Sequence, residues 1–174
     1  MRRADEDQKL DVIATVNGRE RRFSVLPRLS LADTLREELG LYGVRIGCEH
    51  GVCGACTIIV DDVPVRSCLM LGVQANGKRI RTVESLAEGN SLHPLQEAFR
   101  RHHALQCGFC TAGILATSQV LLAENPCPTR EEVREVLSGN ICRCTGYQTI
   151  VDAIMDYAEN GQVGIVDGDQ GQAA

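Results

Sequence analysis

The chain has 174 residues, 44% of them hydrophobic and 3% aromatic, and a formal net charge of -5. This length suits one ordinary domain or two small ones. The lack of a basic surplus argues against nucleic acid or an anionic membrane surface as a partner. The first residues lead into no apolar signal-peptide core, and no segment approaches the roughly 20 apolar residues of a membrane helix. The sequence therefore predicts a cytoplasmic protein without a membrane span.

The first half of the chain has the alternating pattern of a β-sheet, interrupted by one helix. Residues 10–26 predict a hairpin, because apolar residues alternate on both sides of an Asn-Gly pair, a strong signal for a two-residue turn. Ser30 is suited to cap a helix that ends at Gly40. Residues 8–84 are therefore expected to form a sheet of four or five strands with one packed helix. The remaining strands are predicted at 57–60, 63–66 and 78–83.

Beyond residue 84 the spacing of apolar residues changes to that of helices. The short polar stretch at 84–91 predicts a domain boundary, and Thr129 with Glu132 forms the capping box of one helix. Residues 85–160 are expected to form a small all-α bundle, and residues 161–174, rich in Gly, Gln and Asp, a flexible tail. The four helices are predicted around 92–99, 114–122, 133–137 and 150–158.

Nine cysteines, an odd number in a chain expected in a reducing compartment, favour metal binding over a disulfide framework. Four of them have the spacing C-x4-C-x2-C-x11-C, whose first three positions match the 2Fe-2S loop of plant-type ferredoxins, although the fourth arrives early. Gly47, Gly51 and Gly54 let the backbone turn its N–H groups toward sulfur. Zinc is the alternative, but zinc sites more often use separate paired knuckles. This N-terminal quartet comprises Cys48, Cys53, Cys56 and Cys68.

Four further cysteines have the spacing C-x2-C-x31-C-x-C, which is less diagnostic because C-x2-C is a common metal knuckle. Both pairs precede predicted helices, whose N-termini direct positive dipole ends toward an anionic cluster. Arg143 either compensates the negative charge or is a solvated surface residue. Cys127, between two prolines in a predicted loop, is expected to bind no metal. This C-terminal quartet comprises Cys107, Cys110, Cys142 and Cys144.

Three motifs carry a family resemblance: Gly-Cys-Glu-His-Gly-Val-Cys-Gly-Ala-Cys at 47–56, Gln-Cys-Gly-Phe-Cys at 106–110 and Gly-Asn-Ile-Cys-Arg-Cys-Thr-Gly-Tyr at 139–147. Over about residues 10–158 the chain resembles the small iron-sulfur subunit of the molybdenum hydroxylases, the xanthine dehydrogenase and aldehyde oxidase family. The resemblance implies an α+β chain with an N-terminal β-grasp, plant-ferredoxin-like domain and a C-terminal all-alpha four-helix 2Fe-2S-binding domain. It also implies one 2Fe-2S cluster on each quartet.

The resemblance further implies partners: a large subunit with a molybdenum-pterin cofactor of the cytosine dinucleotide form, and a medium subunit with FAD, assembled as a dimer of heterotrimers. Electrons would pass from molybdenum to the C-terminal quartet, then to the N-terminal quartet and FAD, during hydroxylation of an aldehyde or an N-heterocyclic or aromatic substrate. No substrate chemistry would occur on this chain. Gln106 and Cys107 would contact the pterin, although Gln106 could instead cap a loop. A free ferredoxin-like or zinc-binding module is the rival hypothesis.

Overall fold

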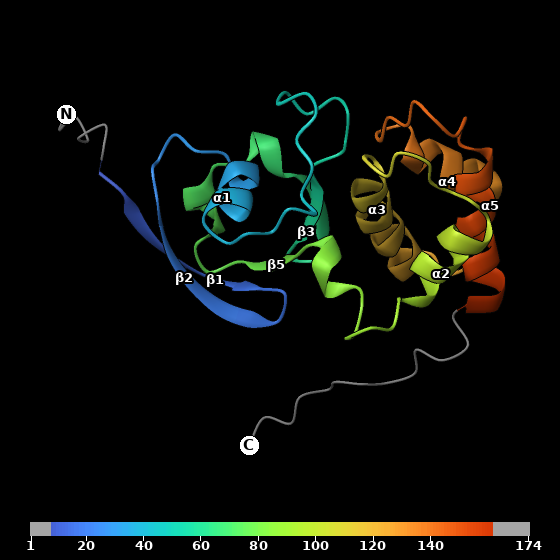
Figure 1. The fold of residues 1–174 in the computed structure, drawn as a ribbon, viewed down its shortest axis with the longest axis horizontal. Helices are drawn as coiled ribbons and strands as arrows, with labels where there is room; N and C mark the ends of the chain where they lie inside the picture. Colours follow the sequence, from blue (N-terminus) through green and yellow to red (C-terminus); the bar gives the residue numbers. More distant parts are fainter. Residues whose placement is uncertain (1–7, 162–174) are drawn as a thin grey trace, which may run out of the picture.

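The computed structural model describes residues 8–161, so the predicted tail lies, apart from its first residue, outside the described residues. The sheet and the helical bundle lie side by side, with the sheet at the left of Figure 1 and the helices at the right. Within the described range, no helix is long and apolar enough to cross a membrane. The α+β composition expected from the sequence is confirmed at this level.

From residue 8 onward, where the structure describes the chain, the N-terminal half contains one five-stranded sheet with the strand order β2-β1-β5-β3-β4. β1 pairs antiparallel with β2 and parallel with β5, while β3 pairs antiparallel with both β5 and β4. The predicted hairpin and the number of strands are confirmed. The strands are β1 (Leu10–Val16), β2 (Arg19–Val25), β3 (Thr57–Val60), β4 (Val63–Arg66) and β5 (Arg79–Arg81).

Local sequence signals account for the opening of the chain. Asn17 and Gly18 both adopt positive φ, as the two central residues of the favoured hairpin turn require. Helix α1 (Leu31–Glu37) begins where the Ser30 side chain accepts a hydrogen bond from the backbone N–H of Asp33. The buried faces of the hairpin and of α1 meet in one apolar core. That core includes Val12, Ala14, Val16, Phe23, Val25, Leu31 and Leu35.

Among the described residues of the C-terminal half there are four α-helices, as predicted. The capping box ahead of α4 is confirmed: the backbone N–H of Thr129 donates to Glu132 Oε2 at 2.6 Å, and Thr129 Oγ1 accepts from the backbone N–H of Glu132 at 3.2 Å. Leu92 lies outside the first helix and is exposed, because His93 caps that helix one residue later. The helices are α2 (Pro94–Arg101), α3 (Thr111–Glu124), α4 (Arg130–Leu137) and α5 (Gln148–Asp156), the last extended by a π turn (Tyr157–Gly161).

Helix α3 packs directly against strand β3 and joins the two halves. Ile59 of β3 meets Ala116 and Val120 of α3 in a separate buried apolar contact. Gly113 brings the backbone of α3 against the chain at Gly54, where a Cβ atom on Gly113 would lie 2.2 Å from the Gly54 carbonyl oxygen. The two halves are therefore pressed together beside the loop that carries the N-terminal quartet.

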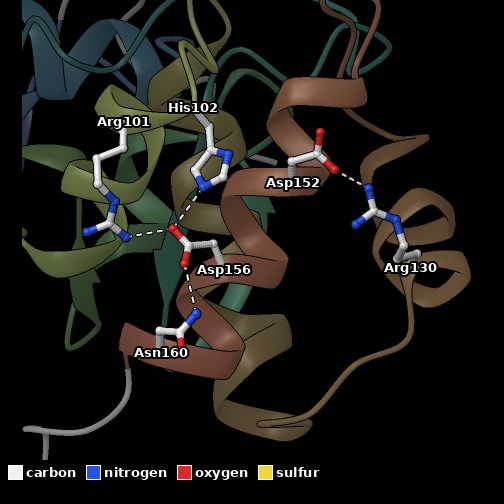
Figure 2. Close-up of polar contacts among 6 residues, drawn as sticks. All are labelled: Arg101, His102, Arg130, Asp152, Asp156 and Asn160. Carbon is white, nitrogen blue, oxygen red and sulfur yellow. Dashed lines mark hydrogen bonds and ion pairs between the residues drawn. The ribbon is translucent and has the colours of Figure 1, made fainter.

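A polar network anchors the end of α5 to the end of α2 (Figure 2). The Asp156 carboxylate accepts hydrogen bonds from Arg101 at 2.6 Å, from His102 at 2.8 Å and from Asn160 at 3.0 Å. The hydrogen bond from Arg101, with those from Asn160 and His102, lowers the pKa of Asp156 from its ordinary value of 3.8 to about 2. Asp156 is therefore more acidic in the folded chain than in the unfolded one.

Replacement of Asp156 by Asn is expected to destabilise the chain at pH 7 by about 1–2 kcal/mol, a value reduced for the partial solvent exposure of the network. Because the pKa is depressed on folding, this stabilisation is present above pH 4 and is lost as the pH falls toward 2. The free energies of unfolding of wild type and variant in urea should therefore differ at pH 7, and at pH 3 that difference should be about half as large. Asp62→Asn, at an exposed carboxylate, is the control and should change little.

Candidate metal centres

The N-terminal quartet lies on a loop between α1 and β3 and on the turn that follows β4. Glu49, Gly51 and Gly54 all have positive φ, so the loop coils tightly through residues 48–56. A Cβ atom on Gly51 would meet the Leu69 side chain at 2.4 Å, which shows how closely the turn carrying Cys68 covers the loop. The glycines of this motif are therefore required by the fold of the loop and by its covering.

Within the N-terminal quartet the thiols approach one another as two pairs. The backbone N–H of Cys53 donates to Cys48 Sγ at 3.4 Å. This bond and a second from the backbone N–H of His50 lower the pKa of Cys48 to about 6. Cys56 and Cys68 form the other pair, and burial together with the contact to Cys56 raises the pKa of Cys68 to about 11. Backbone N–H groups thus stabilise the thiolate of Cys48, whereas burial disfavours the thiolate of Cys68.

The C-terminal quartet combines the loop that precedes α3 with the loop that precedes α5. Cys144 Sγ lies 3.4 Å from Cys107 Sγ, and both residues are exposed. Cys110 and Cys142 are buried and in contact, and burial followed by the contact with Cys142 raises the pKa of Cys110 to about 12. Each pair therefore joins one cysteine from each loop, and one pair reaches the surface while the other faces the interior.

Hydrogen bonds hold the second loop in place around Cys142. Its backbone N–H donates to the Tyr147 hydroxyl at 2.8 Å, and that hydroxyl donates to the Asn140 carbonyl at 3.2 Å. Burial opposes ionisation of Cys142, but hydrogen bonds from Thr145 and from the backbone of Cys144 outweigh burial and lower the pKa of Cys142. The loop is thus built to present a thiolate at this position.

The thiols of each quartet lie in two pairs. The two irons of a 2Fe-2S cluster share four thiolates between them, so such a cluster would take one pair on each iron. In the described part of the chain, Thr111 Oγ1, next to Cys110, is the buried side-chain oxygen that has no hydrogen-bond partner. Paired thiols and an unsatisfied hydroxyl beside them fit a 2Fe-2S cluster.

The two quartets are connected through backbone hydrogen bonds. The backbone N–H of Ile141, which immediately precedes Cys142, donates to the Cys53 carbonyl at 2.8 Å. Asn140 Nδ2 donates to the Gly54 carbonyl at 3.0 Å. Both contacts bring the loop of the C-terminal quartet onto the loop of the N-terminal quartet, and the two loops lie together at the upper side of Figure 1. Cys53 of one quartet thus accepts a hydrogen bond from Ile141, the residue before Cys142 of the other quartet.

The other residues singled out from the sequence have simple surroundings. Gln106 is exposed, and its Nε2 donates to the Cys144 carbonyl at 3.0 Å, so the side chain does brace the loop. Cys127 is exposed on the loop between α3 and α4, and its backbone N–H donates to Asn125 Oδ1. Arg143 is exposed.

Residues that sequence reasoning did not single out also shape the site. Arg66, Asn140 and Thr145 all contact the quartets or the loops between them. Thr145 and Asn140 fall within the motif at 139–147, where their position beside the C-x-C pair was a signal. The sequence signal for Arg66 was limited to its position two residues before Cys68.

Comparison with known proteins agrees with this geometry. Residues 14–87 match the family model of the 2Fe-2S iron-sulfur cluster binding domain, and residues 82–155 match that of the [2Fe-2S] binding domain. The chain is 59% identical to the nicotine 6-hydroxylase small subunit of Paenarthrobacter nicotinovorans, over 90% of this chain and 93% of that one. It is 56% identical to subunit beta of the 6-hydroxypseudooxynicotine dehydrogenase complex of the same organism, over 81% and 89%. Crystalline quinoline 2-oxidoreductase from Pseudomonas putida 86 superimposes with a TM-score of 0.88 at 61% identity, over 92% of this chain and 100% of that one.

Proposed function

The chain belongs to the family of iron-sulfur subunits of the molybdenum hydroxylases, and from this premise we propose that it relays electrons from a molybdenum-pterin subunit to a subunit that carries FAD. Its role as the electron-transfer part of an oxidoreductase complex follows from the family. The geometry of the two quartets supports the finer assignment of ligands and direction, and the subunit names of the relatives support the existence of partner subunits.

Each quartet is proposed to hold one 2Fe-2S cluster, with one thiol pair on each iron. Cys48 with Cys53 and Cys56 with Cys68 form the pairs of the N-terminal cluster. When bound, each cluster supplies one-electron redox chemistry. The chain itself supplies the thiolates, the N–H groups that stabilise them and the burial that limits contact with water. The pairs of the C-terminal cluster are Cys107 with Cys144 and Cys110 with Cys142.

Exposure supports the proposed direction of the relay. Cys107, Cys144 and Gln106 lie at the surface, where a pterin on a large subunit could approach them. The buried pair of the same quartet lies beside the hydrogen bond from Ile141 to Cys53. That hydrogen bond is the observation that carries the proposal, because it joins the two quartets through a short path of covalent bonds and one hydrogen bond. The N-terminal quartet would then pass electrons to FAD.

The remaining finer expectations are part of the same proposal. Residues 8–84 would form a β-grasp, ferredoxin-like domain and residues 85–160 the helical 2Fe-2S domain. The complex would be a cytoplasmic dimer of heterotrimers. The names of relatives point to nicotine and quinoline as substrates of their complexes, so an N-heterocyclic compound is the proposed substrate class here, with aldehydes as the second class.

Metal analysis of the complex purified from its native host tests the proposal. We expect about four iron and four acid-labile sulfide per chain, two distinct electron paramagnetic resonance signals after reduction with dithionite, and copurifying molybdenum and flavin. Stoichiometric zinc without sulfide, or a single cluster without partner subunits, would show a solitary metal-binding module and contradict the relay.

A further inference from the structure

A guanidinium group crosses the seam between the two halves of the molecule. Arg66 ends β4, two residues before Cys68, and is half-buried. Its Nη1 donates to Thr57 Oγ1 at 2.5 Å, and its Nη2 donates to the Gly139 carbonyl at 2.5 Å. Thr57 follows Cys56 directly, and Gly139 lies three residues before Cys142. Arg66 thus reaches from the N-terminal quartet to the loop that carries the C-terminal quartet.

The partners of Arg66 belong to a buried hydrogen-bond network. Thr57 Oγ1 donates to the Gly54 carbonyl at 2.6 Å, and this carbonyl also accepts from Asn140 Nδ2. The Asn140 side chain accepts in turn from Thr117 Oγ1 of α3 at 3.0 Å, and Asn140 is 1% exposed. Such fully connected polar networks fix the relative position of the segments that they join. Here they fix the loops of the two quartets.

The charge of Arg66 has no carboxylate partner within residues 8–161, where its hydrogen bonds go to a hydroxyl and a carbonyl. A half-buried cation is costly unless an anion lies near it. A 2Fe-2S cluster on four thiolates is anionic and gains one further negative charge on reduction. A cation in the seam between two such clusters therefore favours the reduced form of each, and the effect is strong because the site is partly shielded from water.

We propose that Arg66 is a positioning residue that holds the two cluster sites at a fixed separation and raises the reduction potential of both. The inference rests on the proposed function, since it requires a cluster on each quartet. Exposed Arg143 is less suited to this role, because water screens its charge. Arg66 is linked by hydrogen bonds to both loops, so it acts on both sites at once.

The test separates the charge of Arg66 from its hydrogen bonds, using the purified complex and redox titrations followed by electron paramagnetic resonance. Arg66→Gln keeps a donor and removes the charge. We expect it to shift the reduction equilibrium of each cluster about threefold to tenfold toward the oxidised form. A tenfold shift lowers the midpoint potential by about 59 mV for one electron. Arg66→Lys keeps the charge and should leave the potentials near those of wild type. Arg79→Gln removes an equal charge at an exposed ion pair with Asp62 and serves as the matched control.

A second readout reports position. The magnetic splitting between the two reduced clusters depends on their separation. Thr57→Val removes the hydroxyl that bonds both Arg66 and the Gly54 carbonyl without changing charge, so it should alter that splitting while the potentials stay near wild type. Equal potentials in wild type and Arg66→Gln, or an equal fall in the Gln and Lys variants, would overturn the charge role. If the Arg66→Gln variant fails to assemble, lower midpoint potentials in the Arg66→Lys variant would by themselves contradict the charge role. Wild type without two clusters would instead refute the proposed function.

Discussion

Replacement of Cys144 by Ala is expected to reduce the iron content from about four to about two atoms per chain and to abolish turnover of the complex. Cys144 Sγ lies 3.4 Å from Cys107 Sγ, and the two form the exposed pair of the C-terminal quartet. Without Cys144 one iron would keep a single thiolate and open to water, so the cluster should be lost during purification. The measurements are iron, sulfide and the number of reduced-cluster signals.

Cys127→Ala is the matched control for this variant. Cys127 is also exposed, and its backbone N–H donates to Asn125 Oδ1 on a loop between helices. Iron, sulfide and turnover should all match wild type. Loss of iron in the Cys127 variant, or retention of two complete clusters in the Cys144 variant, would show that the proposed quartets are wrong. Loss of turnover with only one of two signals missing would show that the relay depends on both sites.

Local patterns predicted most elements of the fold, because each depends on neighbours in the sequence. The Asn17-Gly18 turn, the Ser30 cap and the Thr129 capping box are formed by residues within a few positions of one another, and all three are confirmed. The eight cysteines were also selected by their spacing, and the structure brings them together as four contacting pairs.

The pairing of thiols could not be read from spacing. The spacing allows pairs within one loop as well as pairs between the two loops. The structure pairs each cysteine of the first loop with one of the second, so that Cys107 meets Cys144 and Cys110 meets Cys142. Pairing depends on how the loops before α3 and α5 approach each other, and that approach is fixed by the bundle.

Local sequence patterns also could not predict the contacts between the two halves. Arg66 and Gly139 are 73 positions apart, and Asn140 and Gly54 are 86 positions apart. Apart from the position of Arg66 two residues before Cys68, nothing in the sequence distinguishes it from the other arginines of the strands. Only the packing of α3 against β3 brings these residues together.

Gly113→Ala is expected to destabilise the chain, although the same change in a helix ordinarily stabilises it by up to about 1 kcal/mol. Its Cβ atom would lie 2.2 Å from the Gly54 carbonyl oxygen and 3.1 Å from that of Ala55. These are backbone atoms of the loop that carries Cys53 and Cys56, so relief requires α3 and this loop to move apart. Such overpacking typically costs about 1–3 kcal/mol, which exceeds the gain in helix propensity.

The movement of α3 away from the loop should change the magnetic splitting between the clusters as well as the stability of the chain. Moving α3 away from residue 54 stretches the contacts of Asn140 and Ile141 with the N-terminal loop, so the magnetic splitting between the reduced clusters should weaken. Ala112→Gly, the reverse change at the half-exposed neighbour on α3, should cost up to about 1 kcal/mol through helix propensity and leave the splitting unchanged. Thermal unfolding and electron paramagnetic resonance of both variants decide the matter. A Gly113→Ala chain as stable as wild type, with unchanged splitting, would mean that the two halves are not held together by this close backbone contact.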